Sequence, residues 1–294
     1  METFSGTSVP DTSLPVIVLL RVSLRLTLVL ALTTAALFFG VRQLEHLMTF
    51  HPVLYQNGAA HWIRPANVEE FWITSPSGKR LNAWLFHVPS SRESRGLILY
   101  HHGNSGNLTS VRQFSESLVT RGYDTIVWDY PGYGHSDGPL PADEAELFAS
   151  AAAVYDFFAQ RTHLPINVWG QSLGSTAAAD LCSRRPCRTL VMESGLSSAR
   201  KYAETRVPWI PSPLQVFIRN RFESAQKLAH VKCPILIAHG TADRTIDYQH
   251  APILFASAAP RAKRLLTIPG GTHWLPSSPA YLDQIATFLA APTQ

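Results

Sequence analysis

This sequence of 294 residues has only three cysteines, Cys182, Cys187 and Cys233, and no two of them form a CxxC pair. So few cysteines exclude a small fold held together by disulfides, and their spacing excludes a zinc ribbon. The hydrophobic content of 46% excludes a disordered or collagen-like chain. A chain of this length can bury a core without metals or disulfides.

The sequence also lacks a concentration of positive charge. Its 25 Lys and Arg residues against 21 Asp and Glu residues give a net charge of +4, and no run is rich in Lys or Arg. A nucleic-acid-binding protein normally carries a concentrated basic face. We therefore expect no nucleic-acid partner.

The amino-terminal segment differs in composition from the rest of the chain. Between residues 14 and 41 the only charged residues are Arg21 and Arg25. A helix over residues 22–41 would be about 30 Å long, which matches the hydrocarbon core of a bilayer, and Arg25 lies near enough to its end to reach the headgroups. We therefore predict a single membrane-spanning helix, with residues 1–48 as anchor and flanks.

Two other interpretations of this segment stay open. A cleaved secretory signal would normally have a shorter apolar stretch, of about 7–15 residues, and an A-x-A-like site after it. A soluble helix packed on the domain would normally alternate with more polar residues. Arg21 and Arg25 precede the apolar run and only Arg42 follows it, so the positive-inside rule places the amino end in the cytoplasm and the main domain outside it.

Residues 49–294 show short apolar runs that alternate with longer amphipathic segments. Apolar runs of this kind are typical of strands buried on both faces, and their alternation with helices predicts an α/β fold with a mostly parallel central sheet and helices on both faces. Ligands bind such sheets beyond the carboxyl ends of the strands. The expected elements are a hairpin at 68–74 and 80–87, strands at 96–100, 124–128, 166–169, 189–192, 234–238 and 264–268, and helices at 108–121, 142–160, 173–182, 249–257 and 279–289.

A G-x-S-x-G motif, Gly170-Gln171-Ser172-Leu173-Gly174, directly follows the expected strand at 166–169. In this motif a strand turns abruptly into a helix, which strains the serine and exposes its hydroxyl. The pattern arises by chance about 0.1 times in a chain of this length, so its position between a strand and an Ala-rich helix carries the argument. We predict that Ser172 is a nucleophile; the alternative is a tight turn without function.

A serine nucleophile needs a base and an acid that orients the base. His273 lies in a glycine-rich loop after the last expected strand, and Asp243 lies in the loop after the preceding strand. Ser172, Asp243 and His273 follow the chain order of α/β-hydrolases, so we predict that they form a catalytic triad. Asp247 and Glu193 are the competing acids, and Glu193 also ends a strand.

Acyl transfer also requires N–H donors for the oxyanion. The backbone N–H of Leu173, next to the nucleophile, is one expected donor. The second is the N–H of Asn104, in a glycine-containing loop after the strand at 96–100. His101 and His102 in the same segment are interpreted as packing residues, and without a third ligand in register we expect neither a metal nor a cofactor.

These residues resemble the α/β-hydrolase superfamily over roughly residues 50–290, and specifically its membrane-anchored serine hydrolases. That branch includes lysophospholipases, monoacylglycerol hydrolases and protein depalmitoylases. The resemblance implies an α/β-hydrolase fold and hydrolysis of an ester or thioester through an acyl-enzyme, without a cofactor. One departure is Pro131, where family members usually carry Arg. The matching blocks are residues 102–107, 129–136, 170–174, 222–224, 239–243 and 271–273.

The fold normally carries its lid between the strands at 189–192 and 234–238, here a small cap at about 195–230. Its prolines argue against one long helix, and we expect one or two short helices bearing Trp209, Phe217 and Ile218. These residues would either form an acyl-binding wall or pack on the sheet.

We therefore expect a single-pass, membrane-anchored serine hydrolase that acts on a small-molecule or lipid ester, with the catalytic domain at residues 49–294. A serine peptidase of the same fold and a catalytically inactive binding protein are the alternatives. The acyl chain length, the leaving group, the oligomeric state and a disulfide between Cys182 and Cys187 stay open.

Overall fold

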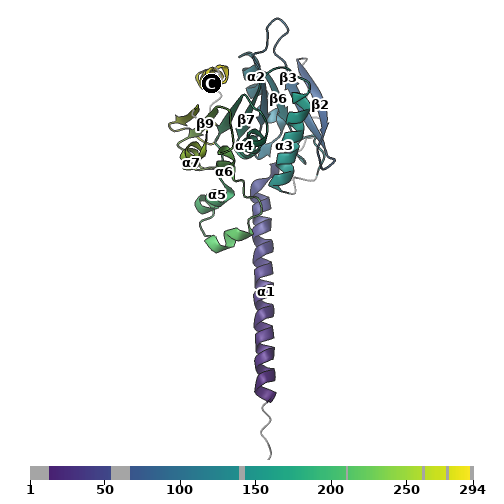
Figure 1. Cartoon of the computed structure of the whole chain (residues 1–294), viewed down its shortest axis with the longest axis vertical. Helices are drawn as coiled ribbons and strands as arrows, with labels where there is room; N and C mark the ends of the chain where they lie inside the picture. Colours follow the sequence, from purple (N-terminus) through teal and green to yellow (C-terminus); the bar gives the residue numbers. More distant parts are fainter. Residues whose placement is uncertain are drawn as a thin grey trace, which may run out of the picture.

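The computed structural model describes residues 13–53, 67–138, 143–209, 211–259, 262–275 and 278–291. A long helix, α1 (Ser13–Thr49), projects from an α/β domain that contains the rest of the described chain (Figure 1). The apolar segment predicted from residue 22 to 41 is therefore the middle of a longer helix.

Eight strands form one sheet in the order β10-β9-β8-β7-β4-β6-β3-β2. The pairs β2–β3 and β3–β6 are antiparallel, and every other neighbouring pair is parallel, which confirms the mostly parallel sheet. The antiparallel hairpin lies at one edge, as its sequence pattern predicts. The bounds are β2 (Val68–Thr74), β3 (Arg80–Phe86), β4 (Leu97–His101), β6 (Asp124–Trp128), β7 (Ile166–Gln171), β8 (Thr189–Glu193), β9 (Ile235–Gly240) and β10 (Lys263–Ile268).

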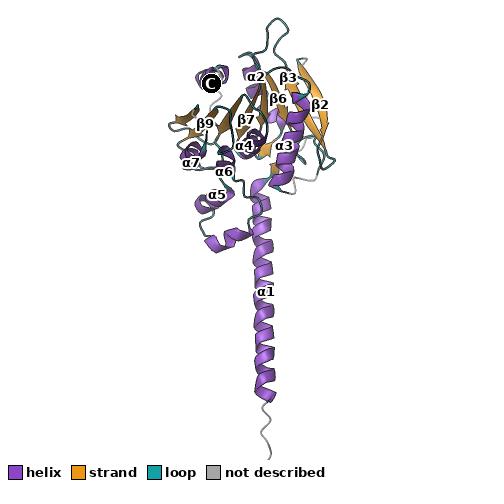
Figure 2. Ribbon diagram, viewed as in Figure 1, coloured by secondary structure: helices purple, strands orange, loops and turns teal. Residues whose placement is uncertain are grey.

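Helices cover both faces of this sheet, and each face has its own hydrophobic core (Figure 2). Successive side chains of a strand point to opposite faces. In β8, for example, Leu190 and Met192 belong to one core and Val191 to the other. The first core also contains residues of α3 (Glu144–Ala159), α4 (Leu173–Arg184) and α7 (His250–Ser257), and the second contains residues of α2 (Arg112–Val119) and α8 (Pro279–Ala290).

The segment expected as a helix at 108–121 is shorter and begins differently. Its first turn is the 3₁₀ helix η2 (Leu108–Val111), and α2 follows only from Arg112. The Asn107 side chain accepts a hydrogen bond from the Thr109 N–H, and the Leu108 N–H donates to the buried Asp129 carboxylate. These side-chain bonds satisfy the first backbone donors and tighten the turn.

The cap between β8 and β9 consists of short elements, as the prolines predict: α5 (Ala199–Arg206), η3 (Ser212–Phe217) and α6 (Ser224–Leu228). Of the three apolar residues expected on its helices, only Phe217 lies within one. Trp209 lies in the turn after α5, and Ile218 directly follows η3. Pro208 directly follows Val207, the C-cap of α5, and disfavours a further helical turn there, while Pro211 directly precedes η3.

Helix α1 has a free part and a docked part. Residues 18–37 are exposed throughout, and Phe38 is the first residue after them that is partly buried. The helix is apolar enough and long enough to cross a membrane, with a mean hydropathy of 2.0 and none of the apolar window buried. After α1, the short strand β1 (His51–Pro52) pairs in parallel with β5 (Ser105–Gly106).

Cys182, Cys187 and Cys233 are all free thiols. The disulfide that the sequence leaves open is therefore not formed in this structure.

Candidate active site

Ser172 occupies the sharp turn between β7 and α4, with φ 54° and ψ −120°. A positive φ is strained for a residue with a side chain. The flanking glycines permit the turn, because a Cβ on Gly174 would lie 2.1 Å from the carbonyl oxygen of His101 and one on Gly170 would lie 2.3 Å from that of Gly174. The Ser172 N–H donates to the Glu193 carbonyl, 2.9 Å away, which ties the turn to the end of β8.

The structure brings Ser172, His273 and Asp243 into one hydrogen-bonded chain. His273 Nε2 lies 3.0 Å from Ser172 Oγ, and His273 Nδ1 lies 2.8 Å from Asp243 Oδ2. All three residues are buried, and they come from loops after β7, β9 and β10. With the Nδ1–H donated to the carboxylate, Nε2 is left to accept the serine proton.

Asp243 is held by several donors besides His273. Its Oδ1 accepts from the N–H groups of Thr245 and Ile246, at 2.8 and 2.9 Å, and His239 Nε2 lies 3.2 Å from its Oδ2. Burial by itself would raise the pKa of Asp243, but the hydrogen bonds from His239, His273 and the Ile246 N–H lower it below its ordinary value. The carboxylate is therefore ionised and fixed in orientation.

His239 is a residue whose role sequence reasoning missed. Its fully buried ring lies at the end of β9, and Nε2 also lies 2.9 Å from the Ile246 carbonyl oxygen. His239 thus connects the two ends of the loop that carries Asp243. The sequence feature that could have indicated this role is its position, four residues before Asp243 at the end of an apolar strand.

The two competing acids have other partners. Glu193 Oε2 accepts from the Tyr281 hydroxyl at 2.8 Å, and burial raises the pKa of Glu193 to about 7. Asp247 Oδ1 accepts from the N–H of Gln249 at 2.8 Å, within its own turn. Of the three carboxylates considered from the sequence, all within the described residues, only Asp243 bonds to His273.

The two residues expected to supply oxyanion donors lie beside Ser172. Leu173 is the first residue of α4, where backbone N–H groups have no partner within the helix. Asn104 lines the same pocket as Ser172 and Leu173. The Asn104 carbonyl accepts from the N–H of His51 at 2.9 Å and the hydroxyl of Tyr133 at 2.8 Å, which holds this loop in place.

His101 and His102 pack beneath that loop. His101 Nδ1 accepts from Trp128 Nε1 at 3.1 Å, and the His102 ring stacks on Tyr130 with centroids 4.1 Å apart. Burial lowers the pKa of His101 to about 3 and that of His102 to about 4, so both rings are neutral. Among the described residues there is no group of three or more His, Cys, Asp or Glu side chains that could hold a metal ion.

The loop that contains Pro131 is hydrogen-bonded to the segment that follows Asn104. Asp129 is fully buried, and its Oδ1 accepts from the N–H of Leu108 at 2.7 Å. Gly134 is required beside it, because a Cβ there would lie 1.9 Å from Asp129 Oδ2. Proline at residue 131 is accommodated in a closed turn in which the Ser136 hydroxyl donates to the Asp129 carbonyl at 2.6 Å.

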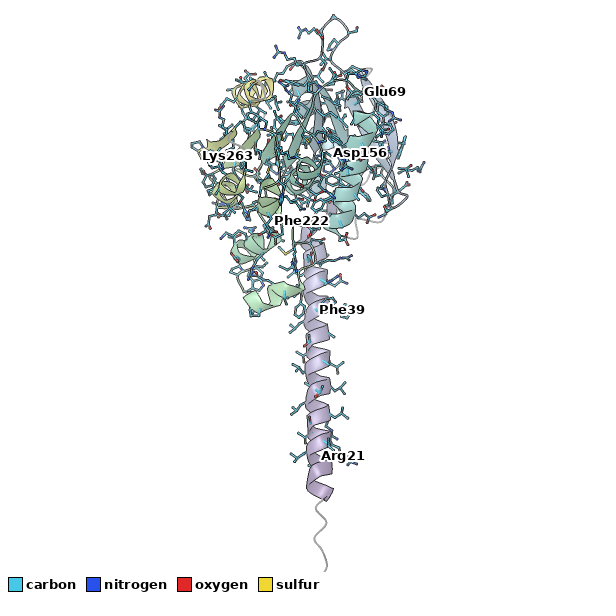
Figure 3. All side chains as sticks on the ribbon, viewed as in Figure 1. Arg21, Phe39, Glu69, Asp156, Phe222 and Lys263 are labelled. Atoms are coloured by element: carbon cyan, nitrogen blue, oxygen red, sulfur yellow. The ribbon has the colours of Figure 1, made fainter. Side chains whose placement is uncertain are left out.

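A largely apolar pocket with a volume of about 130 Å³ opens at Ser172 and continues into a wider space that is open to solvent. Figure 3 shows Phe222, one of its lining residues, where α1 meets the domain. The walls come from the elbow, the cap and the docked end of α1, whose part in the site the sequence analysis missed. The α1 residues that line the pocket are Val41, Leu44, Glu45, Met48 and Thr49.

Comparisons with known proteins agree with this architecture. A family model described as the alpha/beta hydrolase fold matches residues 96–231. The alpha/beta hydrolase domain-containing protein aho-3 of Caenorhabditis elegans is 30% identical over 197 residues, which are 65% of this chain and 57% of that protein. Alpha/beta hydrolase domain-containing protein 17C of Xenopus tropicalis is 31% identical over 208 residues, 69% of this chain and 64% of that protein. The chain thus spans less than two thirds of these relatives.

A solved structure shares the fold. The esterase Pf2001 of Pyrococcus furiosus aligns with a TM-score of 0.63 over 81% of this chain and 98% of that chain, at 15% sequence identity. At this identity the likeness concerns the fold alone.

Proposed function

Because this chain belongs to the alpha/beta-hydrolase superfamily, we propose that it is a serine hydrolase that cleaves an ester or thioester of a small molecule or lipid. The observation that carries the proposal is the hydrogen-bonded chain from Ser172 through His273 to Asp243. This order of nucleophile, base and orienting acid is what acyl transfer by a serine requires.

In the first half of the reaction, Ser172 Oγ attacks the acyl carbonyl and His273 Nε2 takes the hydroxyl proton. The carbonyl oxygen becomes an oxyanion, which the backbone N–H groups of Leu173 and Asn104 receive. When the tetrahedral intermediate collapses, the bond from carbon to the leaving oxygen or sulfur breaks, and the His273 proton passes to the leaving group. Asp243 stabilises the imidazolium throughout and stays ionised.

In the second half, a water attacks the acyl group on Ser172 and gives a proton to His273 Nε2. Collapse of this second intermediate releases the carboxylic acid and returns the proton to Ser172 Oγ. The cycle consumes one water and needs no cofactor, since His273 Nε2 takes and returns each proton.

The proposal includes a membrane anchor. The free part of α1, residues 18–37, is about 30 Å long and matches a bilayer core in length and composition. In this proposal α1 is a single pass, and the arginine distribution places the catalytic domain on the extracytoplasmic side.

The test is hydrolysis of a short nitrophenyl ester by the full-length protein in detergent, with labelling by a fluorophosphonate probe. Ser172→Ala should lower kcat on the order of 10⁶-fold and abolish labelling. Ser117→Ala is the matched control and should retain both, because the Ser117 hydroxyl donates to the Gln113 carbonyl within α2 and does not line the pocket. A wild-type protein that neither labels nor turns over would identify a binding protein of this fold, and a preference for peptide amides over esters would identify a peptidase.

A further inference from the structure

The docked part of α1 forms one wall of the pocket at Ser172. Val41, Leu44 and Met48 lie three and four residues apart, so they share one face of the helix, and all three line the pocket. The facing wall comes from the cap, with Tyr202 and Ile218 among its residues. Ser172 therefore lies in a pocket that has α1 on one side and the cap on the other.

This wall is fixed to the domain by specific contacts. The Glu45 carboxylate accepts hydrogen bonds from the N–H groups of Arg219 and Asn220, at 2.9 and 2.6 Å, and from Asn220 Nδ2 at 2.6 Å. About two helical turns earlier, the Phe38 ring meets Phe217 of the cap edge to face, with centroids 5.8 Å apart. These contacts hold the docked part of α1 in a fixed position against the cap.

The cap presents apolar side chains on the side of the projecting helix. Trp209 is 72% exposed and Val216 is 71% exposed, in a segment of the cap that lies beside α1 where the helix leaves the domain (Figure 1). Exposed apolar residues of this kind, and tryptophan above all, are typical of the zone where a protein meets lipid headgroups. The last residue of the free part, Leu37, is only about 10 Å along the helix axis from Leu44 in the pocket wall.

We propose that this pocket binds the long acyl chain of a membrane-embedded ester, which passes from the bilayer to Ser172 between α1 and the cap. Val41, Leu44 and Met48 of the anchor helix then determine how long an acyl chain is accepted. This inference rests on the proposed function, since it assigns the substrate class of the same site. Its structural basis is that the apolar wall of the pocket and the membrane-crossing segment are one continuous helix.

The acyl-chain wall is tested by Leu44→Trp, with Leu47→Trp on the exposed side of the same helix as the matched control. Each buried methylene contributes about a fourfold gain in binding, so an indole that displaces several methylenes should lower the ratio of kcat/KM for dodecanoyl over acetyl nitrophenyl ester by at least about tenfold. Leu47→Trp should leave this ratio at the wild-type value.

Fluorophosphonate labelling of each variant separates the two levels of inference. If Leu44→Trp labels at Ser172 but keeps the wild-type chain-length ratio, the acyl-wall assignment is overturned while the serine hydrolase stands. If the wild-type protein does not label, the proposed function itself fails.

Entry from the bilayer is tested with the full chain in phosphatidylcholine vesicles that contain a long-chain ester. The double variant Trp209→Ser with Val216→Ser should lose at least about fivefold in turnover of the embedded ester relative to a soluble acetyl ester. Trp72→Ser, an exposed tryptophan on the edge strand β2, is the matched control and should lose nothing. Equal turnover of the embedded ester by the double variant and the control would overturn membrane entry.

Discussion

The triad geometry makes a sharp prediction for Asp243→Asn. Asp243 Oδ1 accepts two backbone N–H bonds, from Thr245 and Ile246, while Oδ2 faces His273 Nδ1 at 2.8 Å. An asparagine keeps Oδ1 as the acceptor for the backbone, so the loop should stay folded. Its amide then directs N–H donors at His273 Nδ1, which forces the imidazole proton onto Nε2, where it faces Ser172.

The expected cost is large because the base then has no free lone pair for the serine proton. In the best-studied triad the same change lowers kcat about 10⁴-fold with the geometry intact, and we expect a loss of that order here. This corresponds to about 5 kcal/mol of transition-state stabilisation. This loss of transition-state stabilisation should exceed any loss in the free energy of unfolding, because only the hydrogen bond to His273 changes its direction.

Hydrolysis of a short nitrophenyl ester measures the loss, and thermal unfolding in detergent verifies the fold. Asp247→Asn, four residues further along the same loop, is the matched control, since Asp247 bonds only to a backbone N–H in its own turn. It should retain activity within about twofold. If Asp243→Asn keeps wild-type turnover, or if Asp247→Asn loses as much, the assignment of the orienting acid is wrong.

Three further variants probe the fold around the site. Gly174→Ala should destabilise the protein by about 3 kcal/mol or more, seen as a lower thermal midpoint, because its Cβ would lie 2.1 Å from the His101 carbonyl oxygen and backbone cannot move aside. Burial raises the pKa of Glu193 from 4.5 to about 7, so the contribution of this group to stability should be complete below pH 4.5 and fall by about 3 kcal/mol between pH 4.5 and 7. Glu193→Gln, which still accepts from Tyr281, should remove this part of the pH dependence in urea unfolding. Glu45→Ala removes the acceptor of three hydrogen bonds, so it should lower the free energy of unfolding by about 2 kcal/mol and speed tryptic cleavage near residue 219. Unchanged cleavage would show that these bonds do not hold α1 on the cap.

The parts of the fold that could be predicted are those where local pattern and chain order are enough. Apolar runs such as residues 189–192 must be strands buried on both faces, and the structure divides their side chains between two cores. The motif around Ser172 predicts the strand–turn–helix because glycine is needed wherever a Cβ would meet backbone, as at Gly170 and Gly174. The positions of His273 and Asp243 follow from the rule that polar residues after parallel strands gather at one edge.

The parts that could not be predicted depend on contacts between distant segments. In the sequence, Glu45 is one charged residue after an apolar run and has no distinguishing pattern. Only the tertiary structure brings residues 219 and 220 to it. Trp209 was expected on a cap helix, but the prolines place it in an exposed turn. His239 contacts Ile246 and Asp243 because the loop after β9 folds back onto its ring. No periodic pattern in the sequence predicts the path of this loop.

The continuity of α1 constrains how the domain can sit on a membrane. An α-helix is stiff along its axis, and the same helix carries both the free residues 18–37 and the docked residues from Phe38 to Thr49. Beyond Thr49 the chain pairs at once with the Asn104 loop through β1 and β5, so no flexible linker separates α1 from the loop expected to hold the oxyanion. If a bilayer surrounds the free part, the pocket wall at Leu44 lies about 10 Å, or two helical turns, beyond Leu37. This is short enough for an acyl chain to remain partly in the membrane while its carbonyl reaches the nucleophile.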